Sequence, residues 1–280
     1  MTKWKLAYQT NCWGPMGGDA VGVTSVSRLT YRTYADMARA IEEIASAGFS
    51  GVEMFDGNLL DYQDRMSTLR QLLDGAGVQL VAAYSGCNFI FPDMLAEELA
   101  RLERVADATA QAGGLYLVVG GGAQRAAGIQ PGDYALLATA LDQVAALAVK
   151  HGLTAHYHPH LSTIVETPEQ VRKIFAQTDI GFCPDTAHLA AGGADVPALL
   201  AEFRERITYV HIKGWQRDPF RFTPLDEGDL NTTAILSKLK ELDFEGWITT
   251  ELDEWADPLA AAKRSRQFFH GFENADAGTR

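Results

Sequence analysis

Eight short apolar runs alternate with longer amphipathic stretches along this chain of 280 residues, and the alternation restricts the fold more than any other feature. Each run is rich in β-branched, aromatic or leucine residues, as strands are when both faces of a parallel sheet are buried. The eight predicted strands are residues 5–9, 51–54, 79–84, 115–120, 154–158, 180–183, 207–212 and 247–251.

Stretches with helical spacing fill the gaps between the strands. In the first of them, Met37, Ile41 and Ile44 recur at intervals of four and three, and Gly48 follows as a helix C-cap. A threonine followed by a proline at 167–168 marks another helix start. The predicted helices are residues 34–47, 94–112, 133–151, one that begins at 167–168, 231–242 and 258–269.

Eight β–α units with no Pro- or Ser-rich linker between them predict an α/β protein with a single domain, a closed (β/α)8 TIM barrel. We expect residues 1–272 to form the barrel and residues 273–280 to form a disordered tail. An open, doubly wound sheet is the rival architecture, but it usually has fewer strands, and no GxGxxG motif follows the first strand.

The charge of the chain argues against nucleic acid and anionic membranes as partners. The net charge is −12, and no cluster of Lys and Arg offers a surface for nucleic acid or anionic lipid. No run approaches the roughly 18 apolar residues of a membrane-spanning helix, and the N-terminus lacks the apolar core of a signal peptide. We therefore expect a cytoplasmic protein that binds neither membranes nor nucleic acid. A homo-oligomer and a small partner subunit both remain open.

Ionisable residues gather at the predicted strand ends, where barrels of this kind carry their chemistry. One residue from each of the last four strands is placed to share an ion, and this candidate ligand set is His158, Asp185, His211 and Glu251. Two imidazoles and two carboxylates suit Mn²⁺, Co²⁺, Fe²⁺ or Zn²⁺ better than Ca²⁺. The sequence therefore predicts one divalent metal site with room for a substrate.

The neighbours of these four residues are candidates for proton transfer. His156 and His160 lie two residues on either side of the expected fifth-strand ligand and are the candidate bases. Lys213 follows the seventh strand and is either a general acid or a solvated loop lysine. Glu53 ends the second strand and is a candidate acid, a substrate-binding carboxylate or the partner of a salt bridge.

Six further residues are candidates for contact with the substrate. His188 would either orient a ligand or cap the helix that follows. Glu227 lies on a loop over the expected mouth of the barrel. Four aromatic side chains either offer an apolar face to a sugar ring or pack in the core: Trp13, Phe55, Tyr84 and Trp215.

Four motifs at these positions resemble the sugar phosphate isomerase/epimerase superfamily, whose barrel is like that of xylose isomerase. They are AHYHPHLST from Ala155, PDTAHLA from Pro184, VHIKG from Val210 and TTEL from Thr249. The resemblance covers nearly the whole chain. It implies a divalent metal at His158, Asp185, His211 and Glu251, most often Mn²⁺, with Co²⁺, Mg²⁺, Fe²⁺ and Zn²⁺ as alternatives.

One departure within the superfamily bears on the reaction. Ketose 3-epimerases and hydroxypyruvate isomerases have a Glu where this chain has His158, and there the Glu is both a ligand and one of two proton-transferring carboxylates. The His-Pro-His triplet that ends at His160 instead resembles the inosose dehydratase branch, to which 3-keto-glycoside lyases and hydratases are similar in type.

The resemblance thus implies a metal-dependent carbon–oxygen lyase, a dehydratase or hydratase that acts by β-elimination beside the ketone of a keto-cyclitol or a 3-keto-sugar. A ketose 3-epimerase or aldose–ketose isomerase acting on a free sugar is the alternative. A non-catalytic accessory barrel is a third and less favoured hypothesis.

Overall fold

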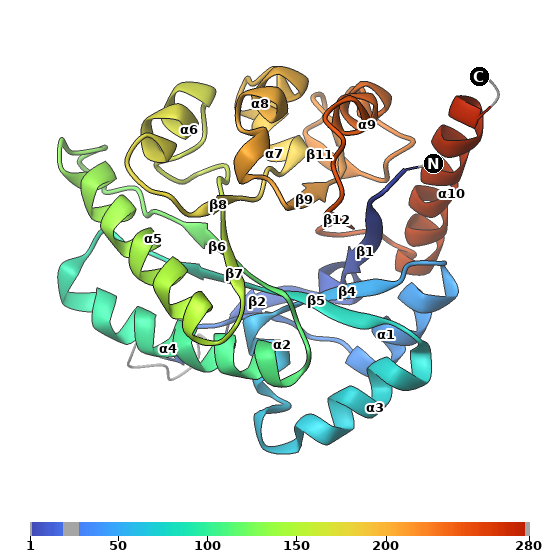
Figure 1. The fold of residues 1–280 in the computed structure, drawn as a ribbon, viewed down its shortest axis with the longest axis horizontal. Helices are drawn as coiled ribbons and strands as arrows, with labels where there is room; N and C mark the ends of the chain where they lie inside the picture. The colour runs from blue at the N-terminus through green and yellow to red at the C-terminus, as the bar shows by residue number, and fades with distance from the viewer. Residues whose placement is uncertain (1, 19–27, 278–280) are drawn as a thin grey trace.

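The computed structural model describes residues 2–18 and 28–277, which form a parallel barrel surrounded by helices (Figure 1). Its strands pair side by side in the order β8-β7-β6-β5-β4-β1-β12-β9, and every pairing is parallel. The eight strands are β1 Lys5–Gln9, β4 Gly51–Phe55, β5 Gln79–Cys87, β6 Tyr116–Gly121, β7 Thr154–His158, β8 Gly181–Phe182, β9 Tyr209–Ile212 and β12 Trp247–Thr250.

A single parallel bridge joins the two ends of this sheet. Asp185, three residues beyond β8, pairs with His211 of β9, and the His211 N–H donates to the Pro184 carbonyl at 3.0 Å. The predicted fold, a single-domain (β/α)8 TIM barrel, is therefore confirmed.

Helices follow the strands and pack around the barrel (Figure 1). Asp36 caps the first of them by accepting from the N–H groups of Ala38 and Arg39, and Thr167 and Gln170 form a capping box at α6. The helices are α1 Met37–Ser46, α2 Asp56–Leu60, α3 Met66–Ala76, α4 Pro92–Gln111, α5 Asp133–Lys150, α6 Pro168–Phe175, α7 Thr186–Ala191, α8 Val196–Glu202, α9 Thr232–Glu241 and α10 Pro258–Ala277.

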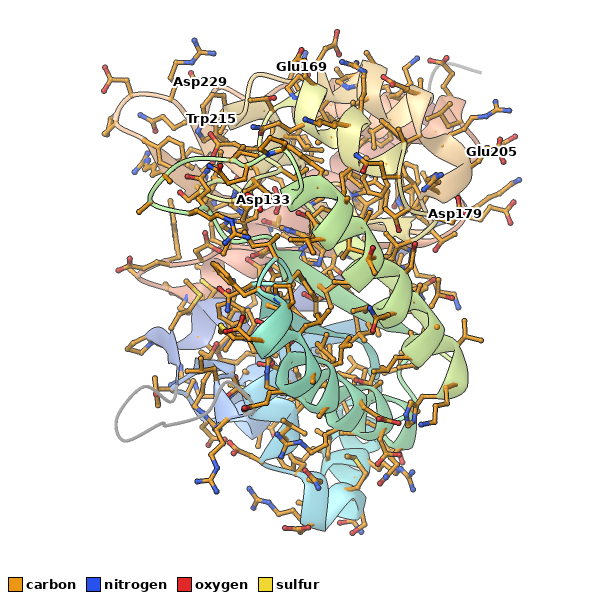
Figure 2. All side chains as sticks on the ribbon, turned by 90° about the vertical axis from the view of Figure 1, so that its left-hand side faces the viewer. Asp133, Glu169, Asp179, Glu205, Trp215 and Asp229 are labelled. Carbon is orange, nitrogen blue, oxygen red and sulfur yellow. The ribbon has the colours of Figure 1, made fainter. Side chains whose placement is uncertain are left out.

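Two small hairpins lie outside the barrel sheet, and the sequence pattern did not predict them. One pairs β2 (Met16–Gly18) with β3 (Tyr31–Thr33), and the other pairs β10 (Gly214–Gln216) with β11 (Arg221–Thr223). In Figure 2, Trp215 and Asp229 lie at one end of the barrel, whereas Asp179 and Glu205 lie at the opposite end.

The last helix is longer than the sequence pattern predicted. α10 runs to Ala277, so the segment expected to be a tail begins as helix, and residues 278–280 lie outside the described part of the chain. Among the described residues, no helix combines the length and the apolar character needed to cross a membrane.

The barrel interior is filled by side chains, as in other closed barrels of this size. The inner layers contain aromatic and aliphatic residues that are less than a tenth exposed: Ala7, Phe55, Val81, Ala82, Tyr84, Val118, Cys183, Tyr209 and Trp247. A second and larger core lies between the strands and the helices. The interior is therefore closed below the strand ends, and chemistry is confined to the rim.

Candidate metal centre and active site

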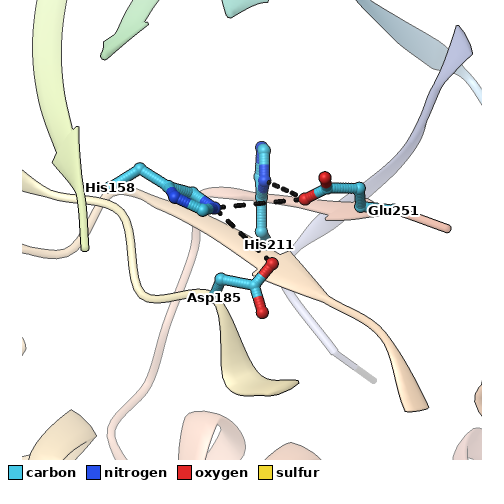
Figure 3. A group of neighbouring side chains, drawn as sticks. All are labelled: His158, Asp185, His211 and Glu251. Atoms are coloured by element: carbon cyan, nitrogen blue, oxygen red, sulfur yellow. Dashed lines mark hydrogen bonds and ion pairs between the residues drawn. The ribbon is translucent and has the colours of Figure 1, made fainter. Parts of the chain in front are cut away.

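The structure brings the four predicted ligands together at the carboxyl ends of their strands (Figure 3). All four are buried, and one ligand atom from each lies within 4.8 Å of the others. His158 ends β7, Asp185 precedes α7, His211 lies in β9 and Glu251 follows β12.

Several polar atoms of this group are buried without a hydrogen-bond partner among the described residues: both ring nitrogens of His158 and Oδ2 of Asp185. His158 Nε2 lies 3.5 Å from Asp185 Oδ2 and 4.0 Å from Glu251 Oε2. Buried polar atoms nearly always have a partner, so orphaned atoms that converge on one point indicate an ion-binding position. Two imidazoles and two carboxylates fit a divalent first-row metal there.

The two carboxylate oxygens of Asp185 have different roles: one caps a helix and the other faces the cluster. Oδ1 caps α7 by accepting from the N–H groups of Ala187 and His188, each at 2.9 Å. Oδ2 turns into the cluster, 3.3 Å from Lys213 Nζ. Burial by itself would raise the pKa of Asp185, but the neighbouring Lys213 ammonium group holds the pKa well below its usual value. The carboxylate is therefore ionised, as a metal ligand must be.

His211 connects two carboxylates through its two ring nitrogens. Nδ1 lies 2.8 Å from Glu251 Oε2, and Nε2 lies 3.0 Å from Glu53 Oε2. Burial opposes protonation of the ring, but Glu53 and Glu251 raise the pKa of His211 to about 10. A ligand histidine commonly donates its second N–H to a carboxylate, which fixes the ring and its tautomer. Glu53 occupies that orienting position.

Of the three roles predicted for Glu53, its position favours the salt-bridge partner over the general acid and the substrate-binding carboxylate. Its side chain is fully buried, and it accepts from Gln9 Nε2 at 2.6 Å and from the Tyr209 hydroxyl at 2.8 Å. The β4–β5 pairing shifts register between Val52 and Glu53, so strand counting alone misplaces this residue. Glu53 lies beneath the cluster and is not among the described residues that line the pocket.

Lys213 is completely buried, so it is not a solvated loop lysine. Its Nζ lies 3.3 Å from Glu251 Oε1, 3.5 Å from Asp253 Oδ1 and 3.2 Å from His188 Nε2. Burial would lower the pKa of Lys213, but Asp185, Asp253 and Glu251 together raise it above its usual value. The ammonium group is therefore charged and fixed at the edge of the candidate metal centre.

Asp253 is a site residue that the sequence analysis missed. It lies at the pocket wall, and Asn11 Nδ2 donates to its Oδ1 at 3.3 Å. Burial raises the pKa of Asp253 to about 6, with Glu251 and Asp185 adding to the rise and Lys213 opposing it. A period of two from Glu251, which places side chains on the same face of an extended chain, is the signal that could have identified it.

His160 and His188 form a close pair, with ring centroids 3.8 Å apart. His160 lines the pocket, and its Nδ1–H donates to the Leu161 carbonyl at 2.7 Å, which leaves Nε2 as the basic nitrogen. Burial lowers the pKa of both histidines, and the nearby Lys213 lowers that of His188 further. Both rings are therefore neutral, and His160 Nε2 can accept a proton.

His156 points into the barrel as the alternation predicted, but it lies one layer too deep to act on a substrate. It is fully buried, and its Nε2 lies 2.8 Å from Thr208 Oγ1, just before β9 begins. The rings of Tyr116 and Tyr209 pack against it at 5.1 and 6.1 Å. Burial lowers the pKa of His156 to about 3. The structure therefore does not bring this candidate base to the pocket.

Three other predicted substrate contacts lie away from the described pocket lining. Trp13 donates to Glu43 at 2.7 Å and is held against α1. Trp215 is buried in the β10–β11 hairpin, with its ring 6.3 Å from that of Phe220. The Glu227 carboxylate accepts hydrogen bonds from Arg221 at 2.7 Å and from Arg264 at 3.0 Å.

A pocket of about 680 Å³ opens beside the four-residue cluster. Glu251, Asp253 and His160 line one end of it. Phe55 and Tyr84, two of the four predicted aromatic contacts, also line it, and the Tyr84 ring packs edge-on against His158 with centroids 5.4 Å apart. A concave site with a few converging polar groups and shifted pKa values is typical of an active site.

Comparison with known proteins assigns the family. The sequence profile of the xylose isomerase-like TIM barrel family matches residues 41–270. The chain belongs to this family. The inosose dehydratase of Geobacillus kaustophilus (strain HTA426) is 29% identical over 266 residues, covering 82% of this chain and 85% of the relative.

Solved structures of other proteins share the fold. An L-ribulose 3-epimerase superposes with a TM-score of 0.77 at 18% identity, covering 99% of this chain and 97% of the other. The 3-keto-D-glucoside 4-epimerase of E. coli superposes with a TM-score of 0.70 at 18% identity, covering 95% and 98%. At these identities the likeness concerns the fold, so the reaction has to be argued from the site.

Proposed function

We propose that this chain is a divalent-metal-dependent lyase that eliminates water, or another β-oxygen substituent, beside the ketone of a keto-cyclitol or 3-keto-sugar. One observation carries the proposal: the ligand position at the end of β7 is an imidazole, His158, where a two-carboxylate proton exchange needs a Glu. Its relatedness to an inosose dehydratase supports the same reaction.

The cluster of His158, Asp185, His211 and Glu251 would hold the ion, for which we propose Mn²⁺. A divalent ion bound there would act as a Lewis acid toward the ketone oxygen and so make the α C–H bond more acidic. The charges of two carboxylates balance the ion, so a neutral polyhydroxylated ketone suits the site better than an anion.

The chain's own residues would move the protons. His160 is neutral and lines the pocket, so its Nε2 takes the proton from the α carbon. The electron pair of that C–H bond forms the new C=C bond to the β carbon as the β C–O bond breaks, and the leaving oxygen then needs a proton. Asp253, whose pKa is raised to about 6, and the Lys213 ammonium group 3.5 Å away are the two available donors.

The alternative is an epimerase, and Asp253 favours it, because this residue adds a second carboxylate beside Glu251 at the pocket. In that reaction one face of the substrate loses a proton and the other face regains one, so the product keeps every atom of the substrate. The two reactions therefore differ in a quantity that mass spectrometry measures directly.

The test combines purified protein and Mn²⁺ with keto-inositols and 3-keto-glucosides, with a metal-chelated sample as control. Elimination predicts a product lighter by one water or one alcohol. In D₂O, a reversible proton step also washes deuterium into the α position of recovered substrate. A product of unchanged mass and altered stereochemistry would establish the epimerase instead.

A further inference from the structure

The pocket has two chemically different ends, and only one of them serves a ring ketone. The polar end carries Glu251, Asp253 and His160. The other end, here called the apolar lip, comprises Met16 of β2, Leu29, Tyr31 of β3 and Phe55 at the end of β4. A polyhydroxylated ring bound at the polar end does not cover the exposed side chains of this lip.

Three of the four side chains of the apolar lip are exposed. Met16, Leu29 and Tyr31 are 45%, 41% and 45% exposed. Single exposed apolar side chains are ordinary on protein surfaces, but several that meet on one rim mark a binding surface. These three side chains meet at the mouth of the same pocket as the candidate metal centre.

The lip is continuous with the reacting end through stacked rings. Tyr31, Phe55 and Tyr84 lie with ring centroids 5.7 to 5.9 Å apart in all three pairings. Tyr84 in turn packs on His158 and on His211, with centroids at 5.4 and 6.3 Å. A continuous series of ring contacts therefore connects the lip with two of the candidate ligands.

Tyr31 is held in place by buried groups. Its backbone N–H donates to Asp56 Oδ1 at 2.8 Å, and Arg101 pairs with the other oxygen of that carboxylate. Its ring lies over Gly86, where an added Cβ would come within 2.4 Å of the ring. This anchoring orders the aromatic face before a ligand arrives, so little entropy is lost on binding.

We infer that the ketone substrate carries a flat apolar substituent, of the size of an aromatic ring, which binds on the apolar lip while the ketone ring occupies the polar end. The inference rests on the proposed function, because that function places the ketone ring. The pocket volume of about 680 Å³ agrees with it, since volumes of about 300–1,000 Å³ hold ligands with more than one ring.

Binding can be measured apart from catalysis with phenyl and methyl β-D-glucoside, which have no ketone and do not react. Calorimetry with the wild-type protein and Mn²⁺ should show that the phenyl compound binds at least about tenfold more tightly. Leu29→Ala and Tyr31→Ala should each reduce that preference about five- to tenfold. Leu115→Ala is the matched control, because Leu115 is 40% exposed and lies outside the pocket lining.

Equal binding of the two glucosides to wild-type protein would overturn the inference, as would an equal effect of Leu29→Ala and Leu115→Ala. Dissociation of an oligomer by Leu29→Ala, with the phenyl preference intact, would assign the lip to an interface between copies and overturn it too.

Kinetics with the phenyl and methyl 3-keto-β-D-glucosides separate this inference from the proposed function. A phenyl preference in binding without elimination from either ketone contradicts the proposed function alone. If both ketones undergo elimination with the same kcat/KM, and Leu29→Ala changes neither value, the proposed role of the apolar lip is contradicted while the proposed function stands. The expected result is elimination with a higher kcat/KM for the phenyl compound, and a smaller ratio in Leu29→Ala.

Discussion

Asp185 and His211 form the bridge that closes the barrel, and the same two residues supply two of the four candidate metal ligands. The backbone of one pairs with the backbone of the other, while both side chains turn into the cluster (Figure 3). Closing the sheet therefore also fixes the spacing of two ligands. The carboxylate of Asp185 adds a third task, because one of its oxygens caps α7.

These tasks can be separated by two substitutions at Asp185. Asp185→Asn keeps an oxygen that can cap α7 but removes the ligand charge, whereas Asp185→Ala removes both. We expect both variants to lose most of the bound metal by elemental analysis. In metal-free thermal unfolding, both variants should lose stability because Lys213 loses its buried carboxylate partner, and the Ala variant should be the less stable of the two by the roughly 1 kcal/mol of a helix N-cap. Full metal occupancy in Asp185→Ala would contradict the ligand assignment.

Strand positions followed from the sequence because buried parallel strands have a simple pattern. Two predicted ranges, 5–9 and 154–158, coincide with β1 and β7, and the other six differ by at most three residues at either end. The four candidate ligands met for the same reason, since the carboxyl ends of parallel strands lie on one rim. Short helices such as α2 and α8, with five and seven residues, are too brief to show a helical period.

The sequence did not predict how deep each side chain lies within the barrel. His156 and His158 lie on the same face of one strand, but only His158 reaches the rim. Glu53 was also placed too high, because strand counting carries no information about register or about the shift beside Val52. Phe55 was predicted as an aromatic contact, but the rest of the apolar lip escaped prediction because it lies on or beside the β2–β3 hairpin, between the first two barrel strands. Local patterns identify elements, whereas depth depends on pairing.

Glu53→Gln should weaken metal binding without unfolding the barrel. The side chain accepts from His211 Nε2 and from the Tyr209 hydroxyl, and loss of its charge removes the partner that fixes the imidazole. Substitution of such an orienting carboxylate commonly lowers metal affinity about 10- to 100-fold. Titration with Mn²⁺ by calorimetry measures this. Wild-type affinity in Glu53→Gln would mean that the contact with Glu53 is structural only.

His160→Gln should slow elimination about 10²- to 10⁴-fold while metal binding is retained, because removal of a positioned base costs that much. The side chain lines the pocket but does not belong to the four-residue cluster. Trp13→Phe is a suitable control, because Trp13 packs against Tyr8 and lies outside the described pocket lining. Steady-state rates and elemental analysis on the same samples give both quantities. Unchanged kcat in His160→Gln would transfer the role of base to another residue.

His156 should make the folded state sensitive to acid. Burial holds its pKa at about 3 in the folded chain, against a usual value of 6.5. Between those two values the unfolded chain binds a proton that the folded chain does not, so this histidine's contribution to stability is present above about pH 6.5 and is lost as the pH falls toward 3. One proton corresponds to about 1.4 kcal/mol per pH unit.

The His156→Gln variant should therefore lose stability less steeply than the wild type between about pH 6 and pH 4, by up to about that slope. Urea unfolding of metal-free protein at several pH values measures the difference. His270→Gln provides the control, because His270 is exposed on α10 and its replacement should leave the slope unchanged. Parallel stability curves for wild type and His156→Gln would show that His156 can take up a proton inside the barrel, which its position between Tyr116 and Tyr209 argues against.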